Sequence, residues 1–202
     1  MSLLVGGRNL ADAGPNAHVV ITWNGTTVRD EVVPPGFFLW TLPLPPPAGE
    51  ADYDELRITS DNPQLAIEQF DAEPAGTPMY GYGTGWNEQE YNPSTGVLWR
   101  WSSNSASLLV RAEGHDMALT LRGEIEADSH SRVTIKADGR EAAAFDVDRT
   151  FSKTVIIPKA LLPGIDNTVT IESSAFYVPA EKKWRSKDHA TSLLIVSLVR
   201  SM

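Results

Sequence analysis

The chain has 202 residues, a formal net charge of −9 and a sequence pI near 4.9. Hydrophobic residues make up 42% and charged residues 21% of it, as in an ordinary soluble globular protein. The acidic balance argues against binding to nucleic acid or to an anionic membrane surface, since both partners require a basic face. The absence of cysteine excludes disulfides, thiolate metal sites and a cysteine nucleophile.

Membrane and export signals are not visible in the sequence. The longest apolar run, residues 193–196, falls far short of the ~20 residues of a membrane-spanning helix. The N-terminal residues lack the basic region and apolar core of a signal peptide. If Met1-Ser2-Leu3 is not native, the chain is expected to be a piece of a longer protein whose other part carries the targeting signals.

Short apolar segments separated by Gly and Pro recur along the whole chain. Their alternation of apolar and polar residues predicts half-buried strands, and no segment shows sustained helical periodicity. The dipeptides Asn24-Gly25 and Asp138-Gly139 are typical of two-residue β-hairpin turns. A helical turn is expected at 159–162. The expected strands are 3–5, 18–23, 26–29, 37–42, 56–59, 65–70, 97–101, 107–111, 117–121, 132–136, 141–145, 151–156, 168–171 and 193–198.

The central part of the chain reads as two loops around a domain boundary. Residues 71–85 hold two prolines and four glycines, which favours a loop and places the boundary near residue 74. Residues 85–93 are expected to form the loop that leads into the next strand. The sequence thus predicts an all-β fold with two tandem antiparallel sandwich units, 1–74 and 75–202.

The two halves share an ordered series of residues at nearly constant spacing, which indicates a duplicated β unit. The matched pairs are Gly7 and Gly123, Asp12 and Asp128, Ile21 and Ile135, the turns 24–25 and 138–139, Phe37 and Phe151, Ile58 and Ile171, and Ile67 and Ile195. Three additional strands precede the second copy, giving about eight, the number of a jelly roll. The first copy is therefore expected to be incomplete, to lean on its neighbour, and to leave an edge that another chain could pair with, as in a dimer.

Aromatic, acidic and amide side chains crowd together between residues 86 and 101. One interpretation is a sugar-stacking platform, in which carboxylates and amides bind the hydroxyl groups beside aromatic rings. Its residues would be Trp86, Tyr91, Trp99, Trp101, Asn87, Glu88, Glu90 and Asn92. The alternative is that Trp99 and Trp101 are core residues sharing one strand face, with Arg100 on the other. Trp86 is then the tryptophan expected at the surface.

Catalytic and metal-binding chemistry receive little support from the sequence. Glu88 and Glu90 could serve as the carboxylate pair of a glycosidase, but the sequence favours a solvated loop, or a loop pinned by an arginine such as Arg100. The four histidines are far apart and show no ligand spacing, so no metal is expected. No phosphate-binding or dinucleotide fingerprint is present, and we expect no cofactor.

An insertion before the last strand, residues 175–192, forms the one basic stretch of the chain. It carries Trp184 among several lysines, which suits a contact with a glycan or a protein partner. The alternative is a loop that covers one end of the sandwich, with Phe176 and Trp184 as apolar plugs.

Three motifs together resemble a known kind of domain. Gly85-Trp86-x-x-x-Glu90, Trp99-Arg100-Trp101 and Phe176-x-Val178-Pro179 are similar to jelly-roll regions at the C-terminal end of bacterial membrane proteins, glycosyltransferase-like ones among them. Such regions resemble galactose-binding-like carbohydrate modules in layout. The resemblance covers mainly residues 80–202, although this chain has Lys187-Asp188-His189 where many members are arginine-rich. It implies no catalytic residue.

The sequence therefore favours a non-catalytic β-sandwich module of a larger cell-envelope protein, outside the cytoplasm. Its expected partners are a glycan or another protein, and the expected ligand-binding residues are Trp86, Glu88, Glu90, Tyr91 and Trp184. A purely structural domain and an enzyme acting on glycans through Glu88 and Glu90 are the alternatives.

Overall fold

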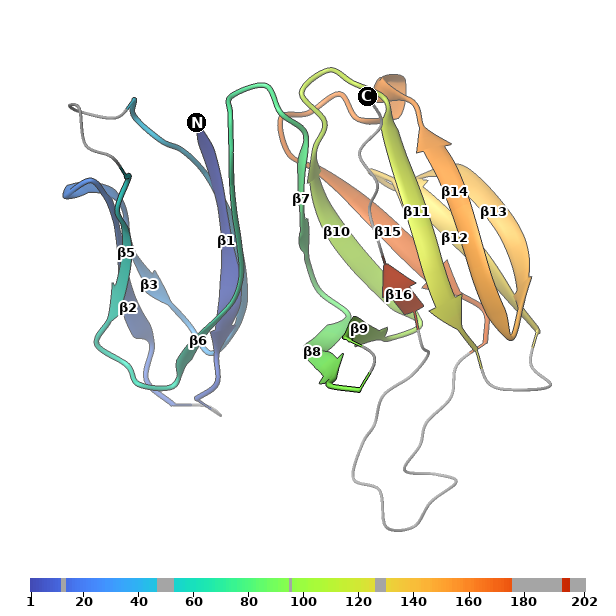
Figure 1. Ribbon diagram of the computed structural model, residues 1–202, viewed down its shortest axis with the longest axis horizontal. Coiled ribbons are helices and arrows are strands. Elements are labelled where there is room, and N and C mark those ends of the chain that lie inside the picture. Colours follow the sequence, from blue (N-terminus) through green and yellow to red (C-terminus); the bar gives the residue numbers. More distant parts are fainter. Residues whose placement is uncertain (12–13, 47–52, 95, 126–129, 176–193, 197–202) are drawn as a thin grey trace, which may run out of the picture. The chain divides into compact units, whose positions relative to one another are not determined.

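The computed structural model describes residues 1–11, 14–46, 53–94, 96–125, 130–175 and 194–196 (Figure 1). The fold is all-β with antiparallel sheets, as the sequence predicts, and Lys159–Leu161 forms a single 3-10 turn where a helical turn is expected. Within the described residues no helix is long and apolar enough to cross a membrane. The chain divides into two compact units, Met1–Gly81 and Tyr82–Met202.

Among its described residues, the first unit has six strands in two three-stranded sheets, and β7 (Met79–Tyr82) begins at its end and continues across the boundary with the second unit. One sheet has the order β4-β1-β6, formed by Gly36–Pro43, Ser2–Asn9 and Leu65–Glu73. The other has the order β3-β2-β5, formed by Thr26–Val33, Ala17–Trp23 and Leu56–Ser60. The two sheets bury their apolar faces against each other.

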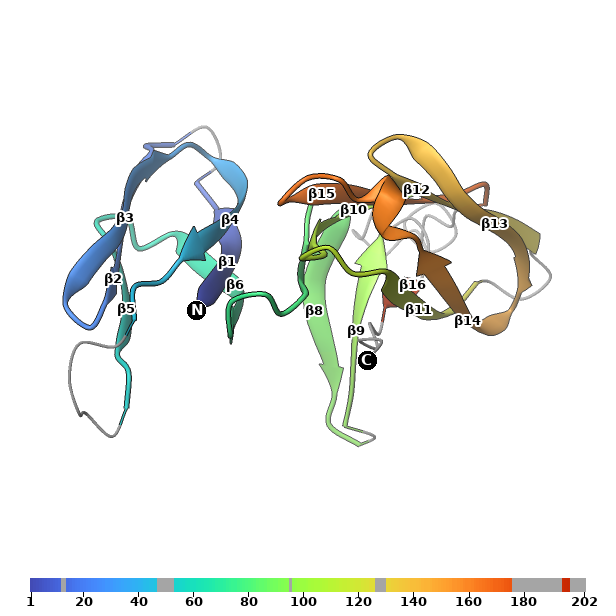
Figure 2. The same ribbon diagram turned by 90° about the horizontal axis from the view of Figure 1, so that it is seen from above.

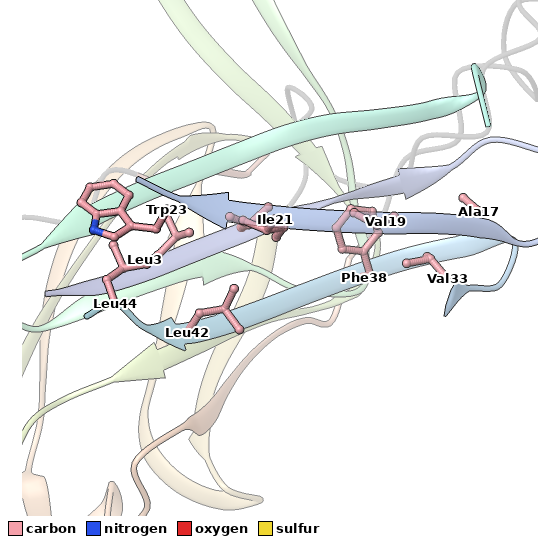
Figure 3. Close-up of a cluster of buried hydrophobic side chains, with 10 residues drawn as sticks. Leu3, Ala17, Val19, Ile21, Trp23, Val33, Phe38, Leu42 and Leu44 are labelled. Atoms are coloured by element: carbon pink, nitrogen blue, oxygen red, sulfur yellow. The ribbon is translucent and has the colours of Figure 1, made fainter. Parts of the chain in front are cut away.

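The core of the first unit follows from the alternation along its strands. Every second residue of β2, from Ala17 to Trp23, is buried, and Leu3 and Val5 of β1 meet them from the other sheet (Figure 3). Val33, Phe38, Leu42 and Leu44 complete this cluster. Full burial of one large apolar side chain stabilises a fold by roughly 1.5–3 kcal/mol, so this cluster is the main source of the unit's cohesion.

The second unit has a five-stranded sheet of order β13-β12-β15-β10-β7 and a three-stranded sheet of order β14-β11-β16. The strands of the first are Arg140–Asp148, His130–Ala137, Asn167–Ser173, Ser105–Arg111 and Met79–Tyr82. Those of the second are Thr150–Ile157, Met117–Glu124 and Leu194–Val196. A two-stranded ribbon, β8 (Trp86–Asn92) and β9 (Val97–Ser102), lies with β9 close to β16.

Two of the predicted loops are in part strands. Residues 85–93 contain β8, and residues 71–85 contain the end of β6 and all of β7. The sequence does not predict β8 as a strand, because most of its side chains are polar and exposed and do not alternate with apolar ones. Pairing with β9 supplies the backbone hydrogen bonds that define it.

The hairpins β2–β3 and β12–β13 have the same turn geometry. Asn24 and Asp138 adopt φ of 48° and 46°, and the glycines after them adopt 76° and 78°. Positive φ at both central positions is the requirement of a type I′ turn, which Asn-Gly and Asp-Gly satisfy at little cost. Each hairpin also shifts register by one residue, after Ile21 in one and after Ile135 in the other.

Each of these turns is tied to a third strand by the same pair of hydrogen bonds. The backbone N–H of Asn24 donates to the Glu55 carbonyl (2.9 Å), and the Glu55 N–H donates to Asn24 Oδ1 (2.7 Å). Asp138 and Thr168 make the equivalent two bonds, both at 2.8 Å. These bonds start the pairing of β2 with β5 and of β12 with β15, so β5 in the first unit stands where β15 stands in the second.

Candidate functional site

The aromatic and acidic residues singled out in the sequence lie on the β8–β9 ribbon (Figure 2). In its register Glu90 is opposite Trp99 and Tyr91 is opposite Leu98. Two residues of β8, Asn87 and Glu88, stand against the single residue between Arg100 and Ser102, which makes a bulge. Opposed residues share a face, so one face carries Glu90 with Trp99 and Trp101, and the other carries Tyr91, Leu98 and Arg100.

Trp86 is buried, and the expectation that it lies at the surface is wrong. Only 4% of it is exposed, and its Nε1 donates a hydrogen bond of 2.7 Å to the Ser107 carbonyl. The ring of Tyr82 meets it edge-on, with centroids 5.2 Å apart. Trp86 therefore fixes the base of the ribbon to β10 and has no face free to stack on a ligand.

Arg100 is the second buried anchor of the ribbon. It is 6% exposed, its guanidinium lies 4.7 Å from the Tyr82 ring centroid, and its Nη1 donates to the Asn87 carbonyl (3.0 Å). Arg100 thus contacts this stretch through the backbone of Asn87, in the bulge. The alternative that Trp99 and Trp101 are core residues with Arg100 outside is wrong, because the arginine takes the buried face and both tryptophans are only half-buried.

The remaining candidates are divided between the two faces of the ribbon. Glu88 and Glu90 are exposed, and the half-buried Trp99 and Trp101 lie on the face of Glu90. On the opposite face Tyr91 is 58% and Leu98 is 53% exposed. One face of the ribbon thus combines Glu90 with the two tryptophans of β9, Glu88 lies in the bulge beside Trp101, and Tyr91 lies on the other face. Trp184 and most of the insertion around it lie outside the described residues.

The approach of the chain to the ribbon depends on Gly85. It adopts φ +84°, and a Cβ at this position would lie 2.2 Å from the Ser105 carbonyl oxygen. Around it the Thr84 carbonyl accepts from Ser107 N–H (2.8 Å), and the Gly85 carbonyl accepts from Ser103 N–H (2.7 Å). Only glycine allows this close pairing, and the pairing sets the direction in which β8 leaves the sandwich.

Histidines and carboxylates are engaged in local pairs elsewhere. His18 Nε2 lies 2.6 Å from Asp30 Oδ1, and His130 Nδ1 pairs with Asp148, both on exposed hairpin surfaces. Among the described residues no three His, Asp or Glu side chains gather into a group that could hold a metal ion.

No family model and no curated protein matches the chain. Among solved structures, the chain is similar to the N-terminal CBM22-1-CBM22-2 tandem domain of Xyn10C from Paenibacillus barcinonensis. The identity is 9% and the TM-score 0.37, over 99% of this chain and 78% of that one.

Proposed function

We propose that this chain is a non-catalytic binding module of a larger cell-envelope protein, outside the cytoplasm, and that its ligand is a neutral carbohydrate. The observation that carries the proposal is the face on which Trp99 and Trp101 stand two residues apart, with Glu90 directly opposite Trp99. Indole faces pack against the C–H groups of sugar rings, and a carboxylate beside them accepts hydrogen bonds from hydroxyl groups.

The roles of the remaining residues follow from their exposure. Glu88, in the bulge, offers a second exposed carboxylate next to the face of Trp101. Tyr91 lies on the opposite face of the ribbon and, like Trp184, remains a predicted contact. Trp86 and Arg100 act as positioning residues that hold the ribbon from below. Two exposed carboxylates disfavour anionic sugars, so the proposed ligand carries no charge.

The arrangement of Glu88 and Glu90 supports a binding role over hydrolysis. A glycosidase places two carboxyl groups on either side of the scissile bond, within a cleft. Here both carboxylates come from one strand of an exposed ribbon, so they approach a ligand from the same side.

A protein contact is the second candidate. It is favoured by Tyr91 and Leu98, which are directly opposite each other and both more than half exposed. A tyrosine and a leucine side by side on a ribbon tip form a small apolar patch suited to a protein partner.

Binding to an array of neutral and acidic polysaccharides separates these candidates. The variants Trp99→Ala and Trp101→Ala should each weaken retention of a neutral glycan about 10- to 100-fold while the far-UV circular dichroism stays unchanged. Ile165→Ser, which alters an exposed apolar residue elsewhere in the same unit, is the matched control. Retention that survives both tryptophan changes, or an array without any bound neutral glycan, contradicts the carbohydrate proposal. Hydrolysis that Glu88→Gln abolishes would contradict the non-catalytic role.

A further inference from the structure

In the part of the chain that the structure describes, the first unit lacks a strand that its counterpart in the second unit has. β15 is paired on both sides, with β12 and with β10. β5 stands in the equivalent place, but among the described residues it pairs only with β2. Its apolar residues Leu56 and Ile58 are partly buried, whereas Val169 and Ile171 at the matching positions of β15 are fully buried.

The edge of β5 presents backbone groups that are ready to pair. Glu55 directs its N–H and C=O to the turn residue Asn24, on the β2 side. Because these directions alternate along a strand, Leu56, Ile58 and Ser60 direct theirs away from β2. In the second unit the residue that matches Ser60 already uses this direction, since the Ser173 N–H donates to the Asn104 carbonyl next to β10 (2.8 Å).

Among the described residues, the same side of the sandwich is left open between the sheets. Phe70 of β6 is opposite the core residue Val5 and therefore lies on the core-facing side of its sheet, yet it is 68% exposed. Ile67, opposite Gly7 on the same face, is also exposed. β5 and β6 are the edge strands of their sheets on one side of the unit, as Figure 2 shows. A strand added to β5 would bring apolar side chains over Phe70.

The negative charge of the first unit indicates that the strand added to β5 is basic. Residues 1–81 contain three arginines and no lysine against eleven Asp and Glu, a net charge of −8, which leaves −1 for residues 82–202. Asp54, Glu55 and Asp61 flank β5 and are exposed. Edge-to-edge pairing of two copies would bring these carboxylates together, and like charges at that distance disfavour it.

We propose that the open side of the first unit, formed by Leu56, Ile58 and Ser60 of β5 with Ile67 and Phe70 of β6, is a strand-addition site. Its occupant is an extended basic polypeptide segment with apolar residues at alternate positions, which pairs antiparallel with β5 as β10 pairs with β15. Backbone hydrogen bonds hold such a segment and the alternate side chains select it. This site is independent of the β8–β9 ribbon.

The test uses the whole chain and a labelled peptide. The peptide has the sequence of residues 104–112, which include β10, with two lysines added at each end. We expect saturable binding by fluorescence anisotropy, weakened about tenfold when salt rises from about 50 to about 500 mM. Hydrogen exchange at the Ile58 and Ser60 amides should slow when the peptide binds. A peptide with glutamates in place of the lysines should bind at least about tenfold more weakly.

Variants then locate the site. Phe70→Ser and Ser60→Pro should each weaken binding about tenfold, the first by removing the apolar contact and the second by removing an edge N–H. Ile165→Ser, with 74% of the isoleucine exposed, is the control and should leave binding unchanged. Absence of peptide binding, or unaltered exchange at Ile58 and Ser60, overturns the proposal without reference to any variant. Self-association that Phe70→Ser abolishes also overturns it, because a second copy then occupies the edge.

Discussion

The guanidinium of Arg100 lies over the ring of Tyr82 at 4.7 Å, and this contact places a cation inside the second unit. A buried arginine is stable only when its donors and its planar face find partners, and the aromatic ring and the Asn87 carbonyl supply them. The exposed face of the β8–β9 ribbon depends on this buried contact for its position.

Replacement of Arg100 should therefore destabilise the second unit. We expect Arg100→Lys to lower the free energy of unfolding by about 1–2 kcal/mol, since lysine cannot stack on Tyr82 and reach Asn87 with a planar fork. Arg100→Ala should cost about 2–4 kcal/mol because packing is lost as well. Urea unfolding followed by tryptophan fluorescence measures both. Equal stability of wild type and Arg100→Lys would show that the planar group is not required.

Trp86 and Trp23 offer a matched comparison of two buried indoles. Trp86 Nε1 has the Ser107 carbonyl as its acceptor, whereas Trp23 Nε1 is buried with no acceptor among the described residues. Trp86→Phe should cost about 1–2 kcal/mol more than Trp23→Phe, because the latter also removes an unsatisfied donor. Denaturant midpoints of the two variants check the difference, and an equal loss for both contradicts the assigned hydrogen bonding.

Alanine substitutions at Gly85 and Gly96 distinguish the cost of a steric clash from the cost of backbone strain. Both have positive φ, +84° and +70°, but a Cβ at Gly85 would collide with backbone, and a Cβ at Gly96 would meet nothing within 4 Å. Gly96→Ala should cost only about 1 kcal/mol, the strain of the left-handed conformation. Gly85→Ala should cost at least about 3 kcal/mol or detach the ribbon. Thermal unfolding of the two variants decides, and similar losses would contradict the close approach at Gly85.

The turn residue Asn24 should stabilise the first unit through its side chain. Asn24→Ala loses the acceptor of the Glu55 N–H and strains a positive φ, so we expect a loss of about 1–2 kcal/mol. Asn24→Asp keeps the acceptor at the same position, as Asp138 does in the second unit, and should cost less. Chemical denaturation compares the two, and a milder loss in the alanine variant would exclude the role of the side chain.

Local patterns predicted the elements that alternate between core and solvent. The hairpin at Asn24-Gly25 was predictable because its turn chemistry and the apolar alternation of β2 agree with the tertiary structure. β8 was not predictable, since its stability comes from pairing with β9 and its side chains are mostly exposed and polar.

The orientation of β9 could not be read from residue type. Hydrophobicity alone puts Trp99 and Trp101 inside and Arg100 outside, whereas the structure buries Arg100 and leaves both tryptophans half-buried. The burial of Arg100 depends on two residues outside β9. Tyr82 precedes the ribbon in the chain, and Asn87 lies in the bulge of β8. Trp86 was misjudged for a similar reason: its partner Ser107 is 21 residues away. Of the predicted site residues that the structure describes, Trp86 is buried, whereas Glu88, Glu90 and Tyr91 are exposed as expected.

The bonds between each turn and its third strand have a consequence for the kinetics of folding. They join residues separated by 31 positions in the first unit and 30 in the second, so neither hairpin reaches its final form until a distant strand arrives. The entropy of closing these two loops is nearly equal, because it varies only with the logarithm of loop length. Closing these two loops should therefore add a similar amount to the folding barrier of each unit, even where the stabilities of the units differ.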